Sequence, residues 1–187
     1  MDVADFLRQS RVVIVAGKGG VGKTTITASL ALLAGRQGLD ALVVELEGKA
    51  GLGACFGRAD PLGYEEATLW EPGEGGRVRG RWLTPDQALL EYLADHGLGR
   101  VSRRLVSSGT LEVVAAAAPG IRDILILGKV KQLERSGQAD LILVDAPATG
   151  HALTFLTSAQ GFLDAVRVGP IRVQAADVNE LLSDPRR

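Results

Sequence analysis

The sequence is poor in sulfur and aromatic residues, and both shortages exclude classes of site. Among 187 residues there is one cysteine, Cys55, and one methionine, Met1, while aromatic residues make up 4%. A single cysteine cannot form an internal disulfide, and one such chain cannot build a metal site from cysteines alone. Low cysteine usage suits a reducing compartment, so we expect a cytoplasmic location. We interpret Cys55 as a small packing residue.

Lysine is also scarce, with five lysines against 16 arginines, and the net charge is −1. This balance gives no electrostatic attraction to nucleic acid, so no nucleic-acid partner is expected. No hydrophobic run approaches the roughly 18 residues of a membrane span, so we expect no transmembrane segment. The acidic N-terminus lacks the hydrophobic run of a signal peptide. A hydrophobic content of 46% supports one globular domain over residues 1–187.

The most informative segment reads GKGGVGKTT and directly follows an apolar run at residues 12–16. It fits the phosphate-binding pattern of a glycine, four residues, and then Gly-Lys-Thr, placed between an expected strand and an expected helix at residues 23–37. The glycines let backbone N–H groups curve around a phosphate, and the helix directs its positive end at the same anion. The sequence therefore predicts a nucleoside-triphosphate site made of Gly17, Lys18, Gly19, Gly20, Val21, Gly22, Lys23, Thr24 and Thr25. Within it, Lys23 is expected to reach the outer phosphates, and the Thr24 hydroxyl to bind Mg²⁺.

Strand and helix patterns alternate along the chain, which predicts a mostly parallel, doubly wound α/β sheet flanked by helices. We expect strands at 11–16, 41–46, 77–83 and 139–145, and helices at 84–95 and 120–137 followed by two more that divide near residues 169–170. Arginines alternate with other residues at 77–83, which suggests an edge strand, and 60–76 reads as a surface excursion. Residues 100–104 are either helix or loop, and residues 110–118 are either strand or helix. Four strands are few for such a sheet, so the domain is expected to be incomplete at its C-terminus.

Three carboxylates follow the expected strands. Asp145 ends an aliphatic strand, where it can hold the Mg²⁺ shell opposite Thr24, or alternatively cap a helix. Glu45 and Glu47 end the second strand. Glu47 either activates the attacking water or is an ordinary solvated strand end, and both interpretations stay open. Glu45 is expected to be structural or to support the residues that form the site.

The early lysine of KGGVGKTT resembles that of the deviant Walker A class of ATPases, which includes the nitrogenase iron protein, the Min and Par partitioning ATPases and the ArsA/GET ATPases. This resemblance implies that Lys18 reaches across a dimer interface to the partner's nucleotide and stabilises the transition state. An arginine finger acts in the same way.

A second segment, DAPATGHAL from Asp145 to Leu153, resembles the DTAPTGHTL switch of the ArsA/GET family, and the stretches at 85–93 and 119–133 are also similar. The resemblance implies an ATP- and Mg²⁺-dependent dimeric switch, paired with itself or with a paralogous ATPase, that drives a client or membrane-protein partner. It implies catalytic roles for Lys18, Lys23, Glu47 and Asp145, and Mg²⁺ binding by Thr24 and, through water, by Asp145. His151 is either a switch residue or a histidine at a helix start.

The departures from the family narrow this interpretation. Glu47-Gly48 stands where the first switch has Asp-Pro, and one cysteine with one methionine cannot supply arsenite thiolates, a zinc pair or a methionine-rich groove. We therefore expect a divergent bacterial branch. The family chain usually continues further and reads adenine with an asparagine-containing stretch, whereas Asn179 is the only asparagine here, so the chain is expected to be truncated. The alternatives are a partitioning-type ATPase and a nucleotide-binding regulatory subunit without turnover.

Overall fold

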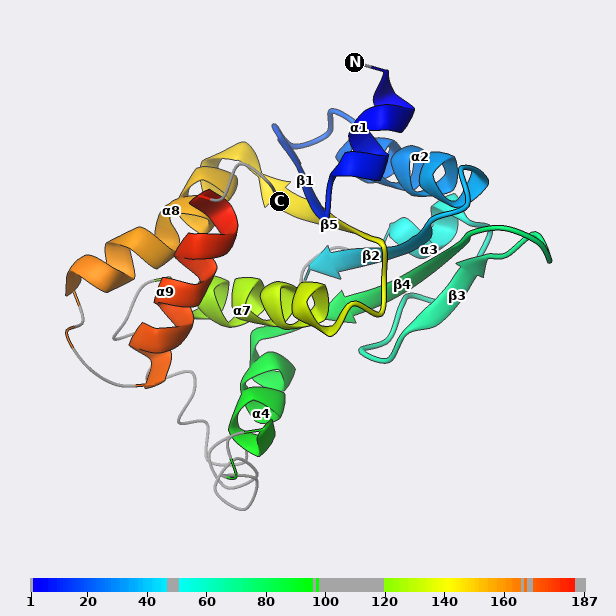
Figure 1. Ribbon diagram of the computed structural model, residues 1–187. Helices are drawn as coiled ribbons and strands as arrows, with labels where there is room; N and C mark the ends of the chain where they lie inside the picture. The colour runs from blue at the N-terminus through cyan, green and yellow to red at the C-terminus, as the bar shows by residue number, and fades with distance from the viewer. Residues whose placement is uncertain are drawn as a thin grey trace. The chain divides into compact units, whose positions relative to one another are not determined.

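The computed structural model describes residues 2–46, 51–95, 97, 120–165, 167 and 170–183, with side chains described except at 149–154, 162, 165, 170 and 171 (Figure 1). The elements in chain order are α1 (Val3–Gln9), β1 (Val12–Gly17), α2 (Lys23–Arg36), β2 (Asp40–Leu46), α3 (Leu52–Cys55), β3 (Ala67–Trp70), β4 (Arg77–Leu83), α4 (Pro85–Asp95), α7 (Ile121–Ser136), β5 (Leu141–Ala148), α8 (Thr149–Ala165) and α9 (Pro170–Ser183). They divide into two compact units: Met1–Leu83 with Leu133–Ala152, and Thr84–Gln132 with Leu153–Asp184.

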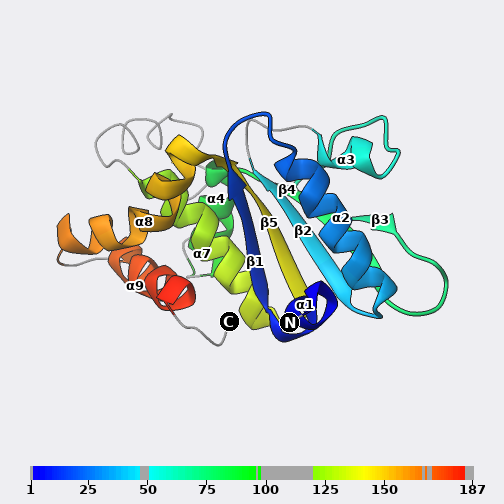
Figure 2. The same cartoon turned by 90° about the horizontal axis from the view of Figure 1, so that it is seen from above.

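The first unit is built on a five-stranded sheet in the order β1-β5-β2-β4-β3 (Figures 1 and 2). β1, β5, β2 and β4 are parallel, and β3 runs antiparallel to β4 at the edge. Because β5 lies between β1 and β2, Asp145 is in register with Val15 on one side and with Glu45 on the other. The carboxyl ends of these three strands therefore meet at one edge of the sheet, which is where open α/β sheets bind ligands. The expectation of a mostly parallel α/β sheet is confirmed.

Helix α2 covers one face of this sheet through a row of small residues (Figure 2). Ala28, Ala31 and Ala34 are buried and belong to one apolar cluster with residues of β2, β4 and β5. Short side chains let a helix approach a sheet closely, and the approach is tightest at Gly35, where an added Cβ would lie 2.8 Å from the ring of Trp70. This packing fixes the helix whose first residue is Lys23.

β4 lies inside the sheet, so the expectation of an edge strand at residues 77–83 is wrong. It pairs with β2 on one side and with β3 on the other. β3 falls within residues 60–76, which the sequence suggested were a surface excursion, so that expectation is also corrected. The side chains of Arg79 and Arg81 are only 12% and 8% exposed. A buried charge requires a partner, and the partners come from distant parts of the chain.

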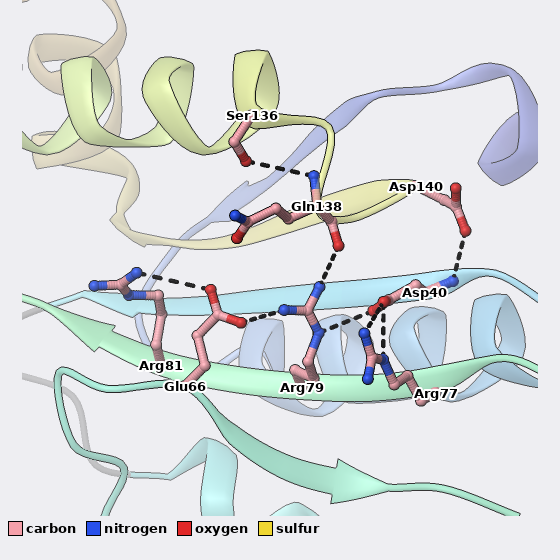
Figure 3. A network of polar contacts seen from close by, with 8 residues as sticks. All are labelled: Asp40, Glu66, Arg77, Arg79, Arg81, Ser136, Gln138 and Asp140. Atoms are coloured by element: carbon pink, nitrogen blue, oxygen red, sulfur yellow. Dashed lines mark hydrogen bonds and ion pairs between the residues drawn. The ribbon is translucent and has the colours of Figure 1, made fainter.

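Those partners form a network of ion pairs that runs from the amino ends of β2 and β4 along β4 to Arg81 (Figure 3). The Asp40 carboxylate accepts hydrogen bonds from Nε of Arg77 at 2.8 Å and from Nε of Arg79 at 2.9 Å. Its hydrogen bond raises the pKa of the Arg77 guanidinium. Glu66 forms ion pairs with both Arg79 and Arg81. A strand that alternates arginine with apolar residues is thus placed in the sheet interior because its arginine face is neutralised.

In the second unit, α4 and α7 share a small apolar cluster of Ala88, Leu89 and Leu125, with Leu93 packed against it. The Thr84 hydroxyl accepts a hydrogen bond from the backbone N–H of Gln87, which confirms the expected helix start at residues 84–87. None of the described helices is long and apolar enough to cross a membrane.

α7 and α9 of this unit are joined by a buried lysine, Lys131, whose ammonium contacts Asp177 and lies 2.8 Å from Oε2 of Glu180. α7 ends before Gly137, which has a positive φ of 64°, so the expected helix end is confirmed. Helix α1 was not expected from the sequence.

The expected helices after the last strand are present as α8, which ends at Ala165, and α9, which begins at Pro170. Residues 100–104 and 110–118, whose structure the sequence left open, lie outside the described residues. Cys55 ends α3 and is exposed, so its interpretation as a packing residue is wrong.

Candidate functional site

Two glycines with positive φ angles shape the loop between β1 and α2. Gly20 and Gly22 have φ angles of 76° and 88°, in the left-handed region that residues with a Cβ rarely adopt. Gly22 is also the residue immediately before α2, so this conformation sets how the chain enters the helix. Residues 18–22 are exposed, and the backbone of the loop is therefore open to a ligand at the positive end of α2.

The two lysines of the loop are placed differently. Lys23 folds back over the loop, and its ammonium donates a hydrogen bond to the backbone carbonyl of Lys18 at 3.0 Å. The stem of Lys23 passes over Gly17, since a Cβ built there would lie 3.7 Å from its Cγ and Cδ, an ordinary van der Waals distance. The Lys18 side chain is exposed, and its ammonium has no hydrogen-bond or ion-pair partner among the residues that the structure describes.

At the start of α2, Thr24 lies next to Asp145 in the carboxyl half of β5. Its hydroxyl donates a hydrogen bond to Oδ2 of Asp145 at 2.6 Å, across 121 positions of sequence. Asp145 is fully buried, and Thr24 is partly buried. A hydroxyl that donates its proton to a carboxylate keeps its lone pairs for a cation, and oxygen donors of this kind suit Mg²⁺. The sequence expectation placed these two residues on opposite sides of one Mg²⁺ shell.

The remaining expected ligands lie on the same loop and first helical turn. Gly19 is near the end of β5, since a Cβ there would lie 4.0 Å from the Cβ of Ala148. Thr25 is exposed, Val21 is 62% exposed and Ile26 is 52% exposed. Two apolar side chains are therefore exposed, one in the loop and one in α2.

Of the two glutamates that the sequence places at the end of the second strand, the structure describes only Glu45, which lies within β2. Glu45 is 1% exposed, and its Oε1 accepts hydrogen bonds from the backbone N–H groups of Gly51 at 2.8 Å and of Leu52 at 2.9 Å. The sequence suggested a structural role for Glu45 but did not identify these hydrogen-bond partners. No sequence motif indicates that a side chain accepts hydrogen bonds from the backbone six and seven residues later. Glu47 and the side chain of His151 lie outside the described residues.

Comparison of the sequence with known proteins shows which family the chain belongs to. The family model described as the CobQ/CobB/MinD/ParA nucleotide binding domain matches residues 12–139. ATPase BagA of Mycobacterium tuberculosis is 37% identical over 179 residues, which cover 92% of this chain and 52% of that protein. ATPase ARSA1 of Chlamydomonas reinhardtii is 31% identical over 195 residues, covering 88% of this chain and 24% of that protein.

ATPase GET3 of Chaetomium globosum is 29% identical over 150 residues, covering 80% of this chain and 43% of that protein. The chain spans about half the length of the mycobacterial relative. Relatives of these names confirm the resemblance to the ArsA/GET ATPases that the two nucleotide motifs suggested. The chain belongs to the CobQ/CobB/MinD/ParA nucleotide-binding family.

Proposed function

We propose that the chain is a Mg²⁺-dependent ATPase that works as a dimeric switch, in which Lys18 of each protomer contacts the nucleotide bound by the other. The observation that carries this proposal is the contrast between the two loop lysines. Lys23 is turned back onto the loop, whereas Lys18 is exposed and has no partner among the described residues. A cation held at the phosphate site but directed outward is suited to neutralising charge on a nucleotide in a facing molecule.

Within one protomer, the loop backbone and the N-terminus of α2 bind the phosphates, and Lys23 neutralises their charge. Thr24 binds Mg²⁺ directly, and Asp145 does so through a bound water. The metal supplies charge neutralisation between the outer phosphates. Glu47 orients or deprotonates the attacking water, and the segment that begins at Asp145 responds to the state of the nucleotide.

The partner is a second copy of this chain or a paralogous ATPase. Val21 of the loop and Ile26 of the first turns of α2 expose apolar side chains, and burying such surface favours association. The hydrolysis cycle drives a client or a membrane-protein partner, and it does so in the cytoplasm. A fractionation in which the chain sediments with membranes in the absence of any partner would contradict this location.

The experiment that tests the proposal measures ATP turnover per protomer over a range of protein concentrations. For a shared site, turnover rises with concentration, and Lys18→Ala lowers it by about 10³-fold while ATP affinity stays within about threefold. The matched control is Arg36→Ala, which removes an exposed cation from the opposite end of α2 and should leave turnover unchanged. Turnover that is independent of concentration and insensitive to Lys18→Ala would refute the dimeric mechanism. Tight ATP binding without turnover would instead identify a regulatory subunit.

The family description also favours a second candidate, a partitioning-type ATPase, because it names MinD and ParA. Such a protein would bind a membrane surface or DNA in its ATP state. Retention on anionic liposomes or duplex DNA at physiological salt, with ATP but not ADP, would support this candidate.

A further inference from the structure

Glu45 is a buried carboxylate of β2 to which the roles assigned above give no part in hydrolysis. It is 1% exposed and lies inside the sheet, in register with Trp82 of β4 on one side and with Asp145 of β5 on the other. Burying a carboxylate is unfavourable unless hydrogen bonds replace its lost hydration. The sheet therefore fixes the backbone of Glu45, and the partners of its side chain show what it holds.

The two donors to Glu45 follow it closely in the chain. Oε1 accepts a hydrogen bond from the backbone N–H of Gly51 at 2.8 Å and from that of Leu52 at 2.9 Å. These groups begin α3, and the first N–H groups of a helix have no partner within the helix. The Leu52 side chain is fully buried in the apolar cluster that includes Val43 of β2. The chain that leaves β2 at Leu46 is therefore attached to β2 again at residues 51–52.

This attachment bounds a short segment that contains the glutamate assigned to the attacking water. Residues 47–50 lie between the end of β2 at Leu46 and the N–H of Gly51 that Glu45 holds. Glu47 is the first residue of this segment. A short stretch of chain fixed at both ends has fewer conformations than one fixed at a single end. The hydrogen bonds of Glu45 thus supply the anchor on the C-terminal side of Glu47.

We propose that Glu45 is a positioning residue for Glu47. It holds the chain after Glu47 to the same strand that holds the chain before it, and so keeps the Glu47 carboxylate at the attacking water. This inference rests on the proposed function, in which Glu47 orients or deprotonates that water. Glu45 acts on the rate of hydrolysis and not on ATP binding, and misplacing a reacting group by about 1 Å can cost about 100-fold in rate.

The first test measures kcat and KM for ATP hydrolysis in saturating Mg²⁺. Glu45→Leu removes the acceptor oxygen and should lower kcat by about 10- to 100-fold, while KM stays within about threefold. Glu45→Gln keeps an acceptor oxygen for the two N–H groups and should retain kcat within about fivefold. The matched control is Glu66→Gln, which changes a different carboxylate of the first unit and should leave kcat unchanged.

A double-mutant cycle tests whether Glu45 acts through Glu47. Glu47→Gln alone should lower kcat by about 100-fold or more, because it removes the group that activates the water. Adding Glu45→Leu to Glu47→Gln should then have no further effect, since the group that Glu45 positions is already lost. Losses that multiply in the double variant would overturn the positioning role, because they would show that Glu45 affects the rate independently of Glu47.

Amide hydrogen exchange on the wild-type protein keeps the proposal falsifiable if Glu45→Leu does not fold. The amides of Gly51 and Leu52 should exchange at least about 10-fold more slowly than those of unstructured chain, and exchange at the unstructured rate would overturn the proposal. Glu45→Met is the second variant, because its flexible side chain fills the space without a strong acceptor. It should lose both the protection of these amides and the same share of kcat as Glu45→Leu.

The outcomes separate this inference from the proposed function. A wild-type chain without turnover, or one whose turnover survives Glu47→Gln, would refute the proposed role of Glu47 and this inference with it. If Glu47→Gln lowers kcat as expected but Glu45→Leu and Glu45→Met leave kcat unchanged, the positioning role alone is refuted.

Discussion

Charged side chains gather at both ends of the sheet in the first unit, and the two ends use them differently. At the amino ends of β2 and β4, Asp40 neutralises Arg77 and Arg79 within the chain, and Glu66 pairs with Arg79 and Arg81 farther along β4 (Figure 3). At the carboxyl ends, Lys18 is exposed without a partner among the described residues, and the Thr24 hydroxyl keeps lone pairs available. The comparison teaches that one end uses charge to maintain the fold, whereas the other retains binding capacity for a ligand.

The largest expected effect tests the carboxyl end. Lys23→Ala removes the cation that lies over the phosphate loop and should lower ATP turnover by about 10²- to 10³-fold. The melting temperature should stay nearly unchanged, because the hydrogen bond lost is the one to the exposed loop carbonyl of Lys18. Steady-state kinetics and thermal unfolding in nucleotide-free buffer measure the two quantities. A Lys23→Ala variant that unfolds readily but retains turnover would show that this lysine maintains the fold and does not serve ligand binding.

The next effect tests the amino end. Asp40→Ala leaves Arg77 and Arg79 without their shared acceptor and should lower the free energy of unfolding by about 3 kcal/mol. ATP affinity should be unaffected, because Asp40 is at the opposite end of β2 from Glu45. Urea denaturation and nucleotide titration of the same sample provide the measurements. A loss of affinity with unchanged stability would show that the network belongs to the binding site.

A smaller effect concerns the packing between α2 and the sheet. In Gly35→Ala, the new methyl would lie 2.8 Å from the ring of Trp70, and we expect a loss of about 1–2 kcal/mol of stability. The control is Gly161→Ala in α8, where a Cβ would meet none of the described residues within 4 Å and alanine should stabilise the helix by about 0.5–1 kcal/mol. Two substitutions of the same chemistry should therefore shift the melting temperature in opposite directions.

The smallest effect is at the surface of α1. Arg8 and Asp5 form an ion pair at 3.4 Å whose side chains are 48% and 54% exposed. Asp5→Ala should change stability by less than about 0.5 kcal/mol, since water screens such a pair. A change as large as that of Asp40→Ala would show that burial does not distinguish the two sets of charges. Denaturation at low and at high salt gives the comparison.

The sequence predicted the features whose cause is local and missed those that depend on distant partners. The phosphate loop, the helix at 84–95 and the four parallel strands follow from short patterns, and all are present. The interior position of β4 was missed because the neutralisation of Arg79 by Asp40 and Glu66 joins three separate segments. β3 was missed because four residues between polar stretches give little periodicity.

The features of the candidate site also fall into those that a short sequence motif predicts and those that depend on distant contacts. That Thr24 and Asp145 would share one site was expected, because a phosphate loop and an acidic strand end belong to one motif set. The contacts of Glu45 with Gly51 and Leu52 could not be read from the sequence, since the acceptors and donors of backbone hydrogen bonds are not marked by residue type. The role of Glu47 stays a prediction.

The exposure of Cys55 makes the chain convenient for spectroscopy. It is the only cysteine of the sequence, and it ends α3, the short helix whose first residue donates a hydrogen bond to Glu45. A thiol-reactive spin label would therefore attach at one defined position per protomer without any cysteine having to be removed. In an assembly of two copies, such a label gives a single inter-protomer distance, and comparing this distance in ATP- and ADP-bound samples would test whether α3 moves with the state of the nucleotide.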